Sequence, residues 1–563
     1  MKTSATMTMG KASKNKQSAT LAWRSSLSQI LAVSVKNFVL LGYGMTLGFP
    51  TLLIPVLSSH NTDEPFSLGE EGLSWVGSIS MICVPFGCFM SGMLTQPLGR
   101  RRSMQLINIP FVAAWLLFYF SSEIWHIFVG LALAGLSGGL MEAPVLTYVA
   151  EITQPHLRGI LSSTSSMSVI GGSMIQFILA TFLNWRTVAL VSAFVPIIPF
   201  CLLFLIPETP IWLLSKKRYV EAKESLAWLR GWVSIEEIDK EYNDLFDQVQ
   251  TSRGIGNEGF QADNGTSNPA NTYGQAVNTE IRKRTKLETV KLFKKRNFIV
   301  PYLLVSFVFF LSHFNGLSPV QTYAVSIFSS FKAPIDKYHA TALLGVVEVI
   351  GCITCVSLVH YFGKRVLTFL SLGGTAICFL VIGTYAHLAN ITSLLSDNSN
   401  STVSNITSHI IERETSGANA WLPMILFIIA AFFSHMGIRV LPWILTGEIF
   451  PNEIRAIASG IAATSFYVFG FICNKVFLSM VSGLTLPGTF WFFSSMSFLG
   501  LIVLFFTLPE TEGKTLHDIT NHFAGKMKLG NNVLRNNEDS GYSFHNEGFV
   551  DDNKNKSDVE SKF

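Results

Sequence analysis

Two matching pairs of charged residues stand at corresponding places in the two halves of the sequence. Glu151 closes an apolar run and Arg158 follows seven residues later, and Glu448 and Arg455 repeat this spacing. A proline lies between the two charges in both copies. Opposite charges at the ends of neighbouring helices can pair in one conformation and separate in another, so they can form a two-state contact. Simple anchoring at a membrane surface is the alternative interpretation.

Two further short signals also occur twice and in the same order. Gly99-Arg-Arg-Arg is matched by Gly363-Lys-Arg, and Pro207-Glu-Thr is matched by Pro509-Glu-Thr. Their charges can join the same network at the helix ends, and the repetition predicts two halves built on one plan. The predicted gating and salt-bridge residues are Arg100, Arg101, Glu151, Arg158, Glu208, Lys364, Arg365, Glu448, Arg455 and Glu510.

Other ionisable residues lie inside the apolar runs. They include Glu142, Glu348, Arg439 and, as a titratable neighbour, His313. Charged groups at mid-membrane depth are costly and usually face a cavity or a partner. We therefore hypothesise that Glu348 faces Arg439 or His313 across a cavity in the second half. A buried structural ion pair without ligand contact is the alternative.

The composition is that of a polytopic membrane protein. Of 563 residues, 49% are hydrophobic and only 14% are charged, against roughly 25% charged residues in a soluble domain. Apolar runs recur at the length of roughly 20 residues that a helix needs to cross a bilayer. We predict an all-α protein with twelve transmembrane helices, at 30–57, 75–98, 104–122, 126–150, 160–183, 187–206, 298–331, 340–362, 366–388, 421–446, 459–481 and 489–508. All seven cysteines lie in apolar runs, so we expect packing and no metal site or cofactor.

The distribution of Lys and Arg predicts the topology. These residues concentrate in the loops that lie inside if the N-terminus is cytosolic, in line with the positive-inside rule. The outer loop 389–420 then carries three acceptor sequons, at Asn390, Asn400 and Asn405. We predict a plasma-membrane protein with a cytosolic tail at 1–29, a first bundle at 30–206, a cytosolic linker with short helices and a disordered loop at 207–297, a second bundle at 298–508 and a cytosolic tail at 509–563.

Taken together, the motifs resemble the signature set of the sugar porters of the major facilitator superfamily. They are Gly99-Arg-Arg-Arg, Glu151…Arg158-Gly, Pro207-Glu-Thr-Pro-Ile-Trp-Leu213, Gly363-Lys-Arg, Pro442-Trp443…Gly447-Glu-Ile-Phe-Pro…Arg455 and Pro509-Glu-Thr-Glu-Gly-Lys-Thr-Leu516. The resemblance covers about 30–525, and the wording around Tyr323 and Trp443 is most similar to the insect facilitated trehalose transporter branch. It implies the major facilitator fold, a substrate site at the midplane and rocking between outward-open and inward-open states.

The resemblance also implies where substrate contacts lie, and several of those positions carry other residue types here. The family's carboxamide positions in spans five, seven, eight and eleven are occupied by Ser166, Ser312, His313, Ser318, Glu348 and Phe466. The span-ten Trp443 and the span-seven gating Tyr323 are kept, and Arg439 replaces a small residue. Carboxamides both donate to and accept from adjacent sugar hydroxyls, so these replacements bring ordinary hexose recognition into question. Trp443 could serve as a platform for a sugar or as core packing.

We therefore predict a carrier for a sugar, either a hexose or a trehalose-like one, that works by alternating access and facilitated diffusion. An enzyme is not expected, since no nucleophile constellation or cofactor loop is present. Residues 37–57 contain no Asp or Glu, whereas the proton-coupled porters of the resembling family carry an acid there. Glu142, Glu348 and His313 leave proton coupling open. A carrier of a charged organic solute and a non-transporting sensor are further alternatives. The expected partners are a small solute and the lipid bilayer, with no nucleic acid, and the oligomeric state is open.

Overall fold

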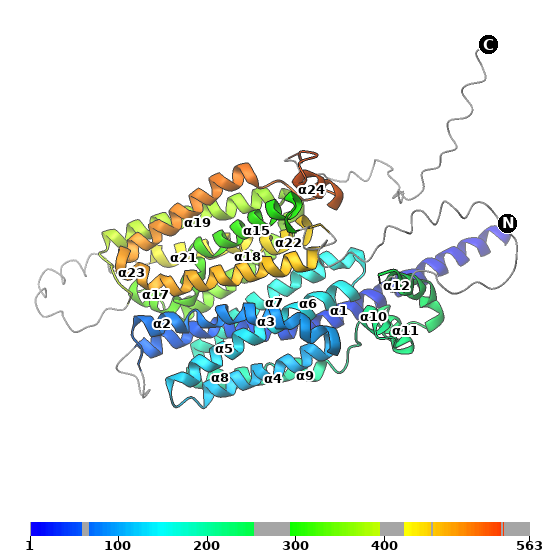
Figure 1. The fold of residues 1–563 in the computed structure, drawn as a ribbon, viewed down its shortest axis with the longest axis horizontal. Coiled ribbons are helices and arrows are strands. Elements are labelled where there is room, and N and C mark those ends of the chain that lie inside the picture. The colour runs from blue at the N-terminus through cyan, green and yellow to red at the C-terminus, as the bar shows by residue number, and fades with distance from the viewer. Residues whose placement is uncertain are drawn as a thin grey trace, which may run out of the picture.

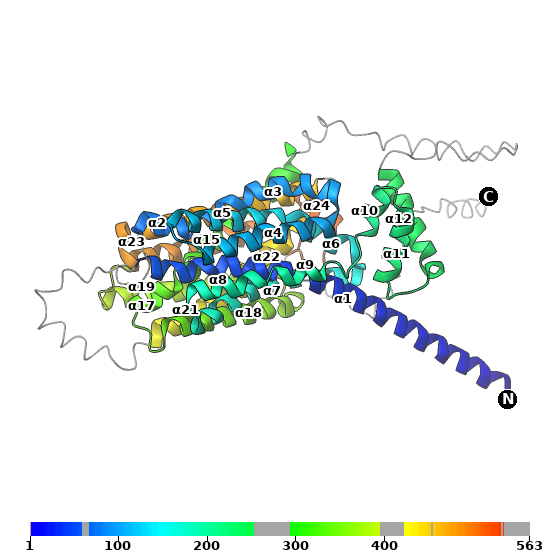
Figure 2. The same ribbon diagram turned by 90° about the horizontal axis from the view of Figure 1, so that it is seen from below.

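The computed structural model describes residues 2–58, 67–252, 293–394, 421–451, 454–530 and 533, and in this part of the chain the regular structure is entirely helical. The long helices run side by side along one axis (Figures 1 and 2). The predicted disordered loop, most of the outer loop 389–420 and most of the C-terminal tail fall outside the described residues.

The first half consists of nine helical segments. Breaks inside single membrane crossings separate α2 from α3, α5 from α6 and α8 from α9. The bounds are α1 (Lys2–Ser58), α2 (Glu70–Val76), α3 (Ile79–Leu98), α4 (Arg100–Tyr119), α5 (Ile124–Leu140), α6 (Glu142–Ile152), α7 (Pro155–Phe182), α8 (Trp185–Phe194) and α9 (Ile197–Leu202). Helix α1 starts well before the predicted span, which began at residue 30.

The second half repeats this plan with different breaks. Its segments are α15 (Arg296–Phe314), α16 (Leu317–Thr322), α17 (Ala324–Ser330), α18 (Lys337–Phe362), α19 (Lys364–Leu388), α21 (Trp421–Met436), α22 (Leu441–Ile449), α23 (Arg455–Thr507) and α24 (Leu516–Phe523). Helix α23 covers two predicted spans, because Thr485 has a non-helical backbone (φ 65°, ψ 165°) that turns the chain.

Ten segments of the described chain are long and apolar enough to cross a membrane. One of them, Ile457–Thr507, contains two crossings, and α4 adds another after its three leading arginines. Together these segments account for the twelve predicted helices. They form an all-α fold of two six-helix bundles, as the sequence predicts.

Close helix contacts depend on glycine at particular places. A Cβ at Gly44 of α1 would lie 1.9 Å from the backbone oxygen of Val169, and one at Gly172 of α7 would lie 2.1 Å from that of Leu41. Small residues let membrane helices approach this closely, where packing rather than the hydrophobic effect holds them together. The two bundles meet where α7 contacts α18 and where α3 and α2 contact α23.

The two ends of the bundle differ. Helices α10 (Pro210–Ser215), α11 (Tyr219–Leu229) and α12 (Asp239–Ser252), with the short η1 (Ile235–Ile238), lie with α24 at one end, which we call the α12 end (Figure 1). Helices α2 and α17 lie at the opposite end, which we call the α2 end. The sequence predicted short helices in the linker 207–297, and α10, α11 and α12 lie in that segment.

Candidate functional site

A break in span seven shapes the centre of the second half. Helix α15 ends at Phe314, and Gly316 adopts φ 92°, a left-handed conformation that costs glycine no steric strain. The Asn315 side chain supports the break, since its Oδ1 accepts from Leu317 N at 3.1 Å and its Nδ2 donates to Ser434 Oγ at 2.9 Å. Span seven therefore restarts as the short helix α16, which carries polar side chains into the bundle. The sequence predicted one continuous span at 298–331.

Gln321 on α16 links the two charged residues that the sequence singled out. Its Nε2 donates to Glu348 Oε2 at 3.1 Å, and its Oε1 accepts from Arg439 Nη2 at 3.3 Å. Glu348 is fully buried on α18. The hypothesis that Glu348 faces Arg439 thus takes an indirect form, because one amide group bridges carboxylate and guanidinium. Gln321 was missed from the sequence, although it lies three residues after Ser318 on the same short helix.

Arg439 lies in a turn and not within a helix. Helix α21 ends at Met436 and α22 begins at Leu441, so the predicted continuous span 421–446 is broken. A Cβ at Gly437 would lie 2.5 Å from Ser371 Cβ, which shows how tightly this turn packs on α19. Arg439 Nη1 also donates to the carbonyl of Ser312 at 3.4 Å. The guanidinium is thus held between spans seven and ten.

Two buried polar atoms in this region have no hydrogen-bond partner among the described residues. They are Glu348 Oε1 and His313 Nε2. His313 Nδ1 lies 3.1 Å from Ser318 Oγ, and the imidazole packs on Phe466 with 4.3 Å between ring centroids. Gly470 makes room for the ring, since a Cβ there would lie 2.7 Å from His313 Cε1. Unpartnered buried polar atoms are costly and are usually satisfied by a ligand or water.

Trp443 packs among other aromatic side chains. Trp443 lies 5.0 Å from Phe466 and 5.1 Å from Phe309, centroid to centroid. This arrangement matches core packing in the present conformation more closely than an open platform. Tyr323 is buried, and its hydroxyl donates to the carbonyl of Asn474 at 3.3 Å. Ser166 is half-buried on α7 and takes no part in the Gln321 network.

A buried lysine in the first half was also missed. Lys36 of α1 is fully buried, and its Nζ donates to Ser165 Oγ at 2.6 Å. Next to it, Asn37 Nδ2 donates to Thr164 Oγ1 at 2.9 Å. The sequence signal was a cation at the start of the apolar part of span one, which the search for an acid in 37–57 passed over.

Hydrogen bonds join the two halves at the α2 end. Asn474 Nδ2 donates to the carbonyl of Gly77 at 3.2 Å, and Lys475 Nζ donates to Ser74 Oγ at 2.7 Å. Lys475 Nζ also lies 4.4 Å from the ring centroid of Trp75. Closer to the centre, Thr51 Oγ1 donates to the carbonyl of Gln321 at 3.0 Å. The α2 end is therefore closed in this conformation.

At the α12 end the repeated charges pair within each half. Arg100 Nη2 lies 2.6 Å from Glu151 Oε1, and Lys364 Nζ lies 2.8 Å from Glu448 Oε1. Lys364 also pairs with Glu512 at 2.7 Å. Partial burial alone would raise the pKa of Glu512, but the hydrogen bonds and charges of Lys364 and His360 outweigh it and lower that pKa.

The two arginines of the repeated pairs bind backbone carbonyls of their own half. Arg158 Nη2 donates to Thr153 O at 3.3 Å, and Arg455 Nε donates to Phe450 O at 3.2 Å. Within the described residues, the recorded contacts of the two repeated Glu/Arg pairs thus stay inside one half. Among the described residues, these two pairs form no hydrogen bond or ion pair between the halves at the α12 end, so the described contacts there leave the halves unlatched.

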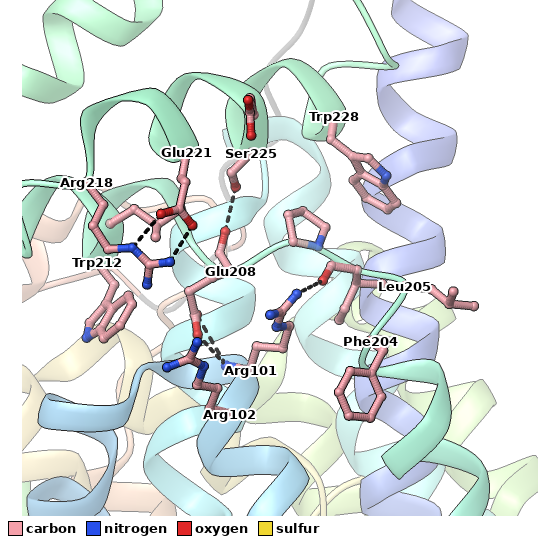
Figure 3. A pocket seen from close by; sticks show the side chains of 14 residues that line it. Arg101, Arg102, Phe204, Leu205, Glu208, Trp212, Arg218, Glu221, Ser225 and Trp228 are labelled. Carbon is pink, nitrogen blue, oxygen red and sulfur yellow. Dashed lines mark hydrogen bonds and ion pairs between the residues drawn. The ribbon is translucent and has the colours of Figure 1, made fainter.

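The repeated Pro-Glu-Thr signal caps the helix that follows the repeated glycine. Glu208 accepts from the backbone N–H groups of Arg100 and Arg101, at 3.0 Å each, and Figure 3 shows Glu208 beside Arg101. Glu510 accepts in the same way from Lys364 N at 3.1 Å and Arg365 N at 3.0 Å. Carboxylates at a helix N-terminus satisfy free N–H groups and the helix dipole. Burial raises the pKa of Glu208, and these N–H groups partly offset the rise.

This geometry explains the repeated glycine. Gly99 and Gly363 have φ 93° and 80°, and a Cβ at either would lie 2.4 Å from the Oε2 of Glu208 or Glu510 respectively. A cavity of about 320 Å³ adjoins the first copy, lined among others by Arg102, and its lining includes none of the midplane candidates. Figure 3 shows this cavity between the start of α4 and the helices of the linker.

Two other expectations concern modification and metals. Asn390 is exposed just after α19, whose first residue Lys364 lies at the α12 end, so Asn390 lies toward the α2 end. Asn400 and Asn405 are outside the described residues. In the described part of the chain, His, Cys, Asp and Glu side chains form no group that could hold a metal ion.

Comparison with known proteins gives the family. The model of the family described as "Sugar (and other) transporter" matches residues 31–523. The facilitated trehalose transporter Tret1 of Polypedilum vanderplanki is 28% identical over 89% of each chain, and Tret1 of Bombyx mori is 27% identical over 90% of this chain and 88% of its own.

Solved structures show the same fold. The xylose transporter XylE from E. coli, in a partially occluded inward-open conformation, superposes with a TM-score of 0.63 at 17% identity, over 86% of this chain and 99% of XylE. Its inward-open conformation gives 0.61 at 19% identity, over 87% and 98%. The twelve-helix architecture and the nearly full-length family match agree, and the chain belongs to the sugar transporter family.

Proposed function

We propose that this chain carries a trehalose-like sugar across the plasma membrane by alternating access and facilitated diffusion. Its membership of the sugar transporter family supports a carrier. The relatives named facilitated trehalose transporters match nearly its whole length and support the substrate class. The observation that carries the proposal is the polar network of buried Glu348 with half-buried Gln321 and Arg439, which lies in the second bundle near its contact with the first.

The network has the chemistry of a site for a neutral polyhydroxylated solute. A carboxylate accepts hydrogen bonds from hydroxyls, and a guanidinium donates them. Glu348 Oε1 and His313 Nε2 are two atoms that substrate hydroxyls can satisfy. Because Gln321 already joins the acid Glu348 to the base Arg439, the site needs no charge on the substrate. This disfavours the charged organic solute as the cargo.

The α12 end is proposed to be cytosolic, with both termini on that side. Closure of the α2 end by Asn474 and Lys475 then makes the present conformation inward-facing. In the outward-facing state the halves would approach at the α12 end. There the Glu151/Arg158 and Glu448/Arg455 pairs could reach across and hold the halves together. This is the proposed role of the repeated charges, since bistable contacts at alternate ends permit alternating access.

Facilitated diffusion is favoured because α1 lacks a carboxylate over 37–57 and carries Lys36 before it. XylE is a proton:xylose symporter, so proton coupling is the second candidate for this chain. The specific observation in its favour is the fully buried Glu348 with one unpartnered oxygen. A carboxylate that alternately takes up and releases a proton would give uptake that depends on the pH gradient.

The test is uptake by purified protein in liposomes of a labelled panel of trehalose, glucose, fructose, a polyol and an organic anion. Facilitated diffusion predicts saturable trehalose uptake that is unchanged by a pH gradient. Glu348→Gln should then lower uptake at every pH. Trehalose accumulation above equilibrium in an inward proton gradient, abolished in Glu348→Gln, would establish coupling instead. Uptake of the anion alone would overturn the sugar proposal.

A further inference from the structure

A chain of hydrogen bonds runs from the proposed site to the contact between the halves. His313 Nδ1 lies 3.1 Å from Ser318 Oγ, and Ser318 Oγ lies 3.5 Å from Asn474 Oδ1. Asn474 Nδ2 lies 3.2 Å from the carbonyl oxygen of Gly77 on the other half. His313, Ser318 and Asn474 are all buried. The chain is therefore screened from solvent along its length.

The direction of each hydrogen bond in this row follows from the acceptor at its end, the carbonyl of Gly77. The carbonyl of Gly77 can only accept, so the Asn474 amide must point its NH₂ group toward that carbonyl. The same NH₂ group also donates to Thr322 Oγ1 at 3.2 Å. Asn474 Oδ1 then faces Ser318, whose hydroxyl must donate to it. The Ser318 oxygen is left to accept from His313 Nδ1–H.

This order determines which atom of His313 can meet a ligand. A neutral imidazole with its proton on Nδ1 carries its lone pair on Nε2. That atom is buried and has no hydrogen-bond partner among the described residues. It is an acceptor, like the unpartnered Glu348 Oε1. Both atoms therefore require O–H or N–H donors, and sugar hydroxyls supply them.

We propose that Asn474 is a positioning residue for substrate recognition. Through Ser318 it holds His313 with Nε2 as a hydroxyl acceptor, and through Gly77 it makes this arrangement depend on closure of the α2 end. When the halves separate at the α2 end, the Asn474 amide loses its Gly77 partner. The hydrogen bonds from Asn474 through Ser318 to His313 are then free to reverse their direction. The inference rests on the proposed function, because it assigns Asn474 a part in binding a hydroxylated substrate.

A double-mutant cycle with His313→Gln tests the proposal, measured as KM and kcat for trehalose uptake into proteoliposomes. Asn474→Leu should raise KM about fivefold in the wild-type background, the effect of one lost hydrogen bond. In the His313→Gln background it should raise KM less than twofold, because the group through which it acts is gone. Ser318→Ala should show the same pattern, and it serves as the second variant if Asn474→Leu does not fold.

Ser74→Ala is the matched control. It removes a different hydrogen bond between the halves at the α2 end, from Lys475, and leaves the chain to His313 intact. Any change in KM that comes only from shifting the conformational equilibrium should occur in Ser74→Ala too, and should be additive with His313→Gln. Additive effects of both Asn474→Leu and Ser318→Ala would overturn the proposal.

Failure of the proposed function gives a different result. If wild-type protein takes up another solute of the panel but no trehalose, the substrate class is wrong. The same cycle, measured with the transported solute, then decides whether Asn474 acts through His313. The two outcomes are independent, because the first is read from the wild type and the second from the coupling between variants.

Discussion

Removing the amide of Gln321 should impair transport more than any other single change of similar size. Gln321→Leu keeps the side-chain bulk but deletes the two hydrogen bonds to Glu348 and Arg439. Glu348 would then have both carboxylate oxygens unpartnered inside the bundle, because Oε1 already lacks a partner. Among the described residues, the Arg439 side chain would keep its long hydrogen bond to the Ser312 carbonyl and no other.

The magnitude follows from the two lost bonds. A hydrogen bond to a charged group contributes about 1.5–3 kcal/mol, so the lower value for both gives about 3 kcal/mol. If the network is needed only for transport, this corresponds to about a hundredfold loss in kcat/KM. Part of the loss will fall on folding stability, so we expect a decrease of between about tenfold and a hundredfold.

The assay is the concentration dependence of trehalose uptake by purified variants in liposomes, with thermal denaturation of each variant alongside. Gln105→Leu is the control, because Gln105 is also buried, on α4, and its Nε2 has no partner among the described residues. That change should leave kcat/KM within about twofold. If Gln321→Leu lowered kcat/KM no more than Gln105→Leu, the network would have no role in transport and its part in the site would be refuted.

Three further predictions concern the ends of the bundle. The pKa of Glu512 is lowered in the folded protein, so the stability it contributes is present above its unfolded pKa of about 4.3 and is lost as pH falls through the lowered folded value. Between pH 5 and about pH 3, the melting temperature should thus fall more steeply for the wild type than for Glu512→Gln. Parallel curves of melting temperature against pH would contradict the pairing with Lys364. Gly99→Ala should destabilise the protein by at least about 1 kcal/mol, because φ is 93° and a Cβ would lie 2.4 Å from a carboxylate oxygen. Gly159→Ala is the control and should not destabilise it, since no atom lies near its Cβ. Equal melting temperatures of the two variants would argue against this geometry. Asn390→Gln should remove one endoglycosidase-sensitive increment of apparent mass in cells, and an unchanged pattern would show that this sequon is bare.

Much of the architecture could be predicted from the sequence because it depends on local properties. A helix needs roughly 20 apolar residues to cross the bilayer, so the twelve crossings could be predicted from apolar runs, including the run at 104–122 that lies in α4. The duplicated motifs fixed the two halves. They also marked the charges at the helix ends as one possible network, but the pairing of Arg100 with Glu151 and of Lys364 with Glu448 came from the structure.

The candidate site was decided by contacts between helices that lie far apart in the sequence. The sequence marked Glu348 and Arg439 as unusual, but nothing local indicates that Gln321 bridges them. Hydropathy does not show the breaks at Gly316 and Gly437, since both lie within continuous apolar runs. Those breaks turn α16 and Arg439 toward α18. Asn474 likewise looks like one polar residue in an apolar helix until the fold brings it within 3.2 Å of Gly77. The length of an apolar run and the position of a charge are local properties of the sequence, whereas the partner of a buried polar group is determined only when the helices pack.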